Sequence, residues 1–306
     1  MTEIVLEKLA HELICSKRLV VGDVKLEIVE VECYHQSPSH PDPFVHCHSD
    51  QLTSDCWYFH KMRKSYRSGT YKGLDYTFGG PEEYGGILIR SVIHDGGLIE
   101  GPCKVVNLLL ELSGVSSIDD LVSFDSKPLS AIGFSGLYIV DYISEHDVVT
   151  TPRVGLSLSG DKPLKFEYIM KPYRYIRSDI ASQIKKYKYL IDLPNSTKTG
   201  ARNERYKKWF EKGKKMEVSD FFAGKMKVQE MCKLYGCWWN KFGDEIKPIK
   251  KESLRYEDKP GVEIIDDVTT EQCNCGSMLL IRQHGLEEDE AGVYAICPKC
   301  LENLYL

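Results

Sequence analysis

The chain has 306 residues, 42% of them hydrophobic, which suffices for one large globular domain or two smaller ones. Its formal net charge of -5 argues against a protein that coats nucleic acid or membrane indiscriminately, although a local basic groove is compatible with it. No run of about 20 apolar residues occurs, and charges interrupt the N-terminal stretch where a signal peptide would be hydrophobic. We therefore expect an intracellular monomer, cytoplasmic or nuclear according to its host, without a membrane partner. Its eleven cysteines are then free thiols or metal ligands rather than disulfides.

In chain order, residues 4–17 carry apolar side chains on one side at helical spacing and predict a short helix. A second helix is predicted after the glycine-proline pair that starts at Gly101, and "SIDDLVSF" predicts a short helix or a turn. The strand patterns cover residues 26–34, 57–60, 73–78, 86–93, 135–143, 152–158 and 164–170. This order of elements predicts a mixed α+β domain with a mostly antiparallel sheet over residues 1–178.

The first long strand pattern, "LEIVEVECYHQ", combines apolar residues with carboxylates and a tyrosine. Alternation along a strand places Ile28, Glu30, Glu32 and Tyr34 on one face of the sheet. An edge strand that manages a solvent-facing surface more often mixes in lysine or threonine. Two interpretations are therefore open for this face, namely a solvated surface and an acid–base site.

Three segments resemble, in order, three blocks of the methylpurine (alkyladenine, 3-methyladenine) DNA glycosylase family, over roughly residues 20–175. "EIVEVECY" is similar to the family's V-E-T-E-A-Y strand. "ILIRSVIHDGGLIEGPCKVVNLL" is similar to its L-L-R-A strand and G-P-[SG]-K helix start, and "PRVGLSLSGDKPLKFEYI" to its R-V-G-V block followed by K-P-L-R-F. Three matches in the right order are stronger than any one local pattern. The resemblance implies a curved antiparallel sheet with flanking helices, and a DNA glycosylase.

The resemblance assigns chemistry to the first strand. It implies that Glu32 activates the water that attacks the sugar and that Tyr34 stacks on the flipped base. A carboxylate suits this step, because cleavage of an N-glycosidic bond develops oxocarbenium character at the sugar. An aromatic floor suits it too, because the base must leave the stack before water can reach it. No lysine lies on this part of the strand, so a monofunctional glycosylase without a lyase step is expected.

The family's pocket also holds a histidine about nine residues beyond the tyrosine. By position His46 is its counterpart, with His48 and His40 as alternatives, and this histidine-rich loop could also be a turn cluster or recruit a metal.

Where the family uses an asparagine to exclude guanine, this chain has Phe78, Gly79 and Gly80. The glycine pair suggests spare room for a bulky modified base, such as glucosylated hydroxymethylcytosine in phage DNA, which would fit a defence role. An alkylated-purine repair enzyme, a non-catalytic DNA-binding module and a zinc-stabilised protein-interaction factor on the same scaffold are the alternatives.

Several residues are predicted to contact DNA. Arg90 matches the family's strand arginine beside the pocket, although a structural ion pair is the alternative for it. Lys104 lies at a helix start, where backbone N–H groups and a lysine attract phosphate. An insertion between residues 57 and 78 combines basic and aromatic residues suited to a minor-groove wedge, with Tyr66 or Tyr71 as the wedge. Its predicted DNA contacts are Tyr66, Arg67, Tyr71 and Lys72.

The composition changes after residue 178. The segment 185–215 is strongly basic and interleaved with aromatic residues, as expected of a surface that follows a phosphate backbone. The alternative is a solvated helix face whose aromatic residues pack inward. We therefore predict a basic, aromatic-rich extension over residues 179–260, with DNA as its partner.

The tail, residues 261–306, carries two close cysteine pairs that could hold a structural zinc ion in a ribbon-like fold. Cys232, Cys237 or His284 could replace one ligand, and a redox pair or reduced thiols are the alternatives. The predicted zinc ligands are Cys273, Cys275, Cys297 and Cys300.

Overall fold

The computed structural model describes most of the first 243 residues and parts of the tail. The described residues are 3–123, 129–132, 136–142, 144, 146–160, 162–184, 190, 193–194, 201–221, 226–243 and, for the backbone of four strands, 268–272, 278–284, 292–296 and 303–305. Among them, no helix is long and apolar enough to cross a membrane.

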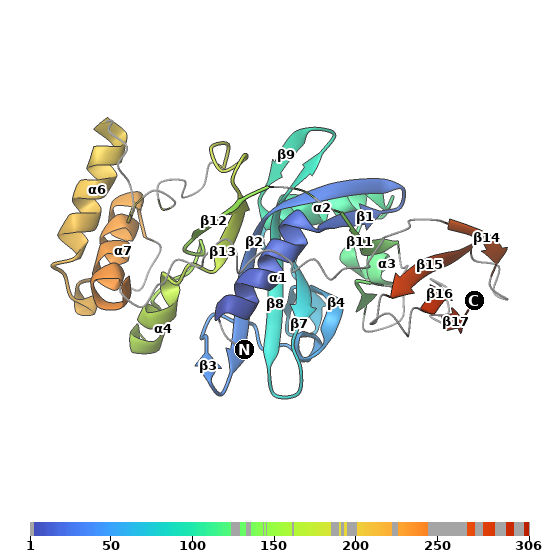
Figure 1. Cartoon of the computed structure of the whole chain (residues 1–306). Coiled ribbons are helices and arrows are strands. Elements are labelled where there is room, and N and C mark those ends of the chain that lie inside the picture. The colour runs from blue at the N-terminus through green and yellow to red at the C-terminus, as the bar shows by residue number, and fades with distance from the viewer. Residues whose placement is uncertain are drawn as a thin grey trace.

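A curved antiparallel sheet dominates the first half of the chain (Figure 1). Its main path joins β10 (Leu129–Ser130), β4 (Ser54–Phe59), β7 (Leu74–Phe78), β8 (Tyr84–His94), β2 (Val24–Ser37), β1 (Lys17–Val21) and β11 (Leu137–Asp141). Off this path lie β3 (His40–Pro41), β9 (Gly97–Glu100), β12 (Val148–Thr151) and β13 (Arg174–Arg177), and a separate hairpin joins β5 (Lys61–Met62) to β6 (Ser65–Tyr66). The predicted α+β class with a curved antiparallel sheet is confirmed.

Strand β2 is the centre of this sheet. It pairs with β8 along one edge, while β1 and β13 share the other edge. Each of these pairings is antiparallel, and β13 reaches β2 at Glu30, Val31 and Glu32. The middle of β2 is therefore hydrogen-bonded on both sides, which holds its side chains in fixed positions.

Helix α1 (Glu3–Cys15) covers one face of the sheet (Figure 1). Its residues Leu6, Ala10 and Leu13 join Val31 and Cys33 of β2 in the main hydrophobic cluster. The same cluster includes residues of α2 (Pro102–Leu112) and α3 (Ile118–Ser123). These two helices confirm the helices predicted after Gly101 and at "SIDDLVSF".

The alternation of β2 is broken near its middle. The pairing with β8 shifts between Ile28 and Val31, as a β-bulge does. Ile28 consequently belongs to the main hydrophobic cluster with Val31, while Val29 belongs to a separate cluster with Ile176. The expectation that Ile28 shares a face with Glu30 is therefore wrong, because strict alternation does not hold across a bulge.

Two of the predicted strands are absent. Residues 164–170 lie largely in a helix, α4 (Lys162–Ile169), and residues 152–158 form an irregular segment after β12. Phe166, Ile169 and Met170 all enter one hydrophobic cluster, and their spacing of three and four residues is helical. The alternation of Leu164, Phe166 and Tyr168 resembled a strand.

A second hydrophobic cluster joins α4 to an antiparallel pair of helices, α6 (Ala201–Gly213) and α7 (Val228–Phe242), with η3 (Val218–Asp220) between them. Trp238 of α7 is fully buried, and its Nε1 donates to the carbonyl of Glu167, 2.8 Å away. The domain boundary predicted at residue 178 would therefore separate α4 from α6 and α7, although these helices share one hydrophobic cluster.

The aromatic residues of the basic segment pack inward where they are described. Phe210 is buried in the second cluster, and Tyr206 and Trp209 pack against it. The alternative of a solvated basic helix face therefore holds for α6, while Tyr187 and Tyr189 lie outside the described residues.

In the tail, the described backbone forms a four-stranded antiparallel sheet of β14 (Val268–Gln272), β15 (Met278–His284), β16 (Gly292–Ile296) and β17 (Asn303–Tyr305). The predicted zinc ligands Cys273, Cys275, Cys297 and Cys300 lie outside the described residues. The zinc site stays a prediction.

Candidate active site

The face of the sheet opposite α1 carries two rows of residues in register. Directly paired residues of antiparallel strands point to the same face, so each row is a line of neighbouring side chains. The first row crosses β4, β7, β8, β2 and β13 through Tyr58, Asp75, Leu88, Glu32 and Arg174. The second row crosses β7, β8 and β2 through Thr77, Gly86 and Tyr34. This face brings together acidic, basic and aromatic groups from five strands.

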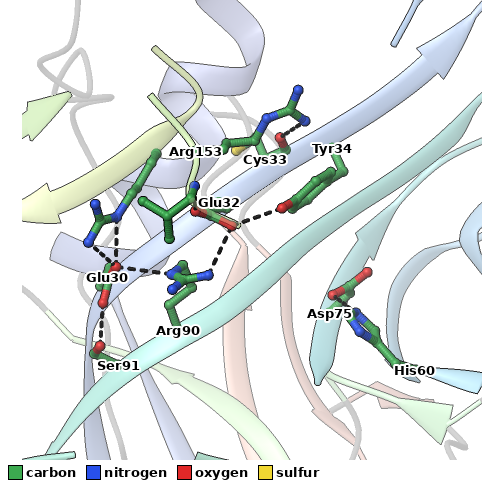
Figure 2. Close-up of polar contacts among 11 residues, drawn as sticks. Glu30, Glu32, Cys33, Tyr34, His60, Asp75, Arg90, Ser91 and Arg153 are labelled. Atoms are coloured by element: carbon green, nitrogen blue, oxygen red, sulfur yellow. Dashed lines mark hydrogen bonds and ion pairs between the residues drawn. The ribbon is translucent and has the colours of Figure 1, made fainter. Parts of the chain in front are cut away.

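Glu32 is fully buried and accepts three hydrogen bonds (Figure 2). The backbone N–H of Val154 donates to Oε1 at 2.8 Å, while the hydroxyl of Tyr34 at 2.8 Å and Nη1 of Arg90 at 3.1 Å donate to Oε2. All three groups are donors, which matches the acceptor oxygens of a carboxylate. The irregular segment after β12 is what places Val154 here, although a strand was predicted for it.

Arg90 connects Glu32 to a second buried glutamate, Glu30. Its Nε donates to Oε1 of Glu30 at 3.0 Å, and Arg174 and the hydroxyl of Ser91 also bind this carboxylate. Burial alone would raise the pKa of Glu30, but the Arg174 and Arg90 charges outweigh burial and hold the pKa below its ordinary value. Burial likewise disfavours the charge of Arg90, yet Glu32 and Glu30 keep the pKa of Arg90 above its usual range. The predicted site arginine therefore lies at the site as an ion pair.

Tyr34 is half-buried between Glu32 and Arg153. Burial and the neighbouring Glu32 raise the pKa of Tyr34 well above its ordinary value, so its hydroxyl keeps the proton that it donates to Glu32. The Arg153 guanidinium carbon lies 4.6 Å from the centre of the Tyr34 ring. Arg153 is itself fixed by Asp42, at 2.6 and 3.1 Å, and by the Cys33 carbonyl at 3.1 Å. The orientation of the Tyr34 ring is thus set by buried contacts.

His46 lies in a cluster of aromatic rings around Tyr58. Its ring centre is 4.4 Å from that of His60 and 6.1 Å from that of Tyr58. Burial, followed by the neighbouring His60, lowers the pKa of His46 to about 4, so the side chain is neutral near pH 7. The alternative counterpart His48 stacks on Tyr58 at 5.0 Å, while His40 contacts His35 and Tyr168.

Phe78 and Gly79 lie elsewhere. Phe78 belongs to the main hydrophobic cluster, and its ring centre is 6.0 Å from that of His35. A Cβ at Gly79 would collide with the carbonyl oxygen of Gln51, so this glycine provides no room for a larger base. The prediction of spare space at Gly79 is wrong, because backbone fills the place of its side chain.

Two of the residues predicted to contact DNA, Lys72 and Lys104, lie at α2, while Arg90 lies at Glu32. The Lys72 ammonium donates to Asn107 of α2 at 2.7 Å, and Lys104 is exposed on the same helix. Of the two wedge candidates, Tyr71 is 72% exposed, whereas Tyr66 packs against the main hydrophobic cluster. Arg67 donates to the carbonyl of Lys61 at 3.3 Å.

Besides Glu30, four buried charged residues of this region were not predicted as site residues. They are Asp75, held by His60 and Gln51; Arg153; Arg174; and Asp42. A charged residue between apolar or aromatic neighbours is the sequence signal that could have indicated Asp75, in "LDYTF", and Arg174, in "YRYI". Asp42 and Arg153 stand 111 positions apart, and no local pattern joins them.

The fold and this face define a class: an α+β protein whose central strand carries a buried carboxylate held by a tyrosine and an arginine. No protein-family model matches the chain. It is 37% identical over 198 residues to a protein named Uncharacterized protein L759 from Acanthamoeba polyphaga mimivirus, and the match covers 59% of this chain and 88% of that protein. The chain therefore belongs to the same family as this mimivirus protein.

Proposed function

We propose that the protein is a monofunctional DNA glycosylase that hydrolyses the N-glycosidic bond of a modified base and leaves an abasic site. The observation that carries the proposal is the Glu32 carboxylate, fixed by Tyr34, Arg90 and Val154 on the sheet face opposite α1. A carboxylate held in one place can accept a proton from water and stabilise positive charge that develops at the sugar. The sequence resemblance assigns this task to the same residue.

Tyr34 supports the proposal as the floor for a base turned out of the helix. Its ring is held by the Glu32 hydrogen bond and by Arg153, and part of it is exposed. A fixed aromatic ring can stack on a base without a large loss of side-chain entropy. Arg90 and Arg174 together would offset the charges of Glu30 and Glu32 and so limit their repulsion of phosphate.

A second candidate function is a DNA-binding module that keeps the scaffold without the reaction. The full burial of Glu32 favours it, because the water to be activated has to reach a carboxylate that has no exposed surface. In this case the Glu32 ion pair serves stability alone.

The proposed substrate class is a modified base, either an alkylated purine or a sugar-bearing hydroxymethylcytosine. Gly79 no longer supports the larger base, although a Cβ at Gly80 would meet open space. DNA is the proposed partner, with Tyr71, Lys72 and Lys104 as backbone and groove contacts. A structural zinc ion in the tail stays part of the proposal.

The test is a strand-break assay after alkali on DNA that carries alkylated purine, hypoxanthine or glucosylated hydroxymethylcytosine. We expect breaks on one substrate class with wild type and a loss of at least about 100-fold in Glu32→Gln. Glu27→Gln is the matched control, since Glu27 is also an ion-paired glutamate of β2. Tight DNA binding without breaks on any substrate would establish the binding module instead.

A further inference from the structure

A second buried carboxylate, Glu30, lies two positions before Glu32 on β2, and the chemistry proposed above gives it no task. Its side chain is 1% exposed. Arg90 Nε donates to its Oε1 at 3.0 Å and Arg174 Nε at 2.7 Å, while the hydroxyl of Ser91 donates to Oε2. These donors belong to β8 and β13, the strands on either side of β2. A carboxylate enclosed in this way does not reach a substrate, so any task it has in the site is carried out through its neighbours.

The register of the sheet gives Arg90 an unusual place. Ile89 of β8 pairs with Val31 of β2, and Ser91 pairs with Glu30, so Arg90 is an extra residue of β8 at this point. An extra residue of this kind forms a β-bulge, and a bulge re-aims the side chain that it carries. The contacts of the guanidinium group, rather than a residue directly opposite, therefore determine where the Arg90 side chain lies.

Two carboxylates hold this guanidinium group (Figure 2). Nε of Arg90 donates to Glu30 at 3.0 Å, and Nη1 donates to Oε2 of Glu32 at 3.1 Å. Because a guanidinium group is planar and rigid, bonds from two of its nitrogens to two separate acceptors determine both its position and its plane. The contact with Glu30 thus sets the direction from which Nη1 approaches Glu32.

Glu30 is itself fixed from its other side by Arg174. Nε and Nη2 of Arg174 lie 2.7 and 2.6 Å from Oε1 of Glu30, and Arg174 has no exposed surface. In the register of β13 and β2, Arg174 is directly opposite Glu32. Positive and negative groups therefore alternate from Arg174 through Glu30 and Arg90 to Glu32, and the second carboxylate adds no net negative charge to the site.

We propose that Glu30 is a positioning residue of the candidate active site; this inference rests on the proposed glycosylase function. Glu30 holds Arg90 in the orientation in which Nη1 donates to Glu32, and Arg90 holds the Glu32 carboxylate where it takes a proton from the attacking water. Glu30 touches neither the base nor the water. Because misplacement of a reacting group by about 1 Å can lower a rate about 100-fold, loss of Glu30 acts on the rate of excision.

The test is single-turnover excision by Glu30→Gln, on the substrate class that the wild type cleaves. Glutamine keeps the shape of the side chain and removes the charge that holds Arg90. We expect the rate constant at saturating enzyme to fall about 10- to 100-fold, while the DNA dissociation constant stays within about 2-fold of wild type. A residue that serves stability alone leaves the rate constant of the folded protein unchanged. Glu27→Gln is the matched control, because Glu27 lies on the same strand but pairs with Arg177 at 2.6 Å.

A double-mutant cycle shows whether Glu30 acts through Arg90. Arg90→Met should cause a comparable loss, and adding Glu30→Gln to it should lower the rate constant by less than about 2-fold more, because both changes remove the same support of Glu32. Losses that multiply would overturn the positioning role and leave the glycosylase standing. A folded Glu30→Gln that excises as fast as the wild type would have the same meaning.

Thermal unfolding shows whether each variant is folded. If Glu30→Gln does not fold, Ser91→Ala takes its place in the cycle, since it removes one hydrogen bond of Glu30 and leaves the charge of Glu30 present. Its expected loss is about 3- to 10-fold in the rate constant, and an unchanged rate constant would overturn the role of Glu30. A wild type that excises no base would overturn both proposals.

Discussion

At the scale of single residues, Arg90 is the cation that both buried glutamates share. The Arg90 side chain is 8% exposed. Among the described residues, Arg90 is the one charged donor that binds the Glu32 carboxylate. Removal of one partner from a buried ion pair costs about 3–5 kcal/mol, because a charge is left without compensation. We expect Arg90→Met to lower the free energy of unfolding by this amount in urea denaturation.

Arg18→Met is the control for this change. Arg18 pairs with Glu27 at 3.4 Å with both side chains partly exposed, and a pair of this kind contributes about 0–1 kcal/mol. Equal losses in the two variants would show that the charge of Arg90 carries no special weight in the fold.

Glu30 makes stability depend on pH. Its folded-state pKa lies below the ordinary value of 4.5, so the ionised group stabilises the fold above that pH, and this contribution is lost as the pH falls below it. We expect the difference in unfolding free energy between wild type and Glu30→Gln to be largest near pH 7 and to narrow below pH 4.5. Denaturation at a series of pH values measures it, and Glu82→Gln in an exposed turn should stay within about 0.5 kcal/mol of wild type throughout.

The residues of the site differ in how far they could be predicted. Glu32 and Tyr34 lie two positions apart on one strand, so alternation alone places them on one face. The contacts of Glu32 with Arg90 and Val154 span 58 and 122 positions and depend on how the sheet is assembled. The contact of His60 with Asp75 spans 15 positions, and no local pattern around His60 indicates it.

At the scale of elements, two helices approach each other through glycines. A Cβ on Gly236 of α7 would collide with the carbonyl of Phe210 in α6, and one on Gly213 with the carbonyl of Lys233. The two backbones are in contact at these points, so no flexible side chain can move aside. We expect Gly236→Ala to lower the free energy of unfolding by about 1–3 kcal/mol in urea, as overpacking does.

Gly80→Ala is the matched control for this substitution. A Cβ at Gly80 meets no atom within 4 Å, and its backbone is outside the left-handed region. An equal loss in both variants would mean that the close approach of α6 and α7 does not limit the packing of these helices.

Elements also show where local patterns fail. The alternation of residues 164–168 indicated a strand, yet packing of Phe166, Ile169 and Met170 against α7 selects a helix. The bulge in β2 has no local signal either, because it arises from pairing with β8. Both errors come from partners that are distant in the sequence.

At the scale of the whole molecule, the net charge of -5 conceals an uneven distribution. The exposed surface of α6 carries Arg202, Arg205 and Lys208. If these residues bind phosphates, their replacement by glutamine should weaken DNA binding. The plot of the logarithm of the DNA-binding constant against the logarithm of the salt concentration should then become less steep by about 0.9 for each phosphate that is no longer neutralised. Lys25→Gln on the exposed side of β2 is the control. An unchanged slope would assign DNA binding to the hairpin and α2 instead.

The two hydrophobic clusters make contact, which bears on how the molecule unfolds. Phe44 packs against both clusters, and Arg153 bonds Asp42 and the carbonyl of Tyr168 in α4. A boundary at residue 178 predicts two units that unfold independently, whereas these contacts predict one cooperative unit. Trp238→Ala empties a fully buried site and should cost about 3–5 kcal/mol.

Hydrogen exchange of the β8 amides distinguishes the two models of unfolding. In one cooperative unit, Trp238→Ala lowers the protection of β8 as much as that of α7, because the same global opening exposes both. Trp239→Ala, at the partly buried neighbouring residue, should lower the protection of β8 and of α7 by less. If β8 kept its protection while α7 lost it, the helices would be a separate unit. A mutation there could then alter DNA docking without disturbing Glu32, whereas in a cooperative unit every destabilising change in α7 also weakens the support of the site.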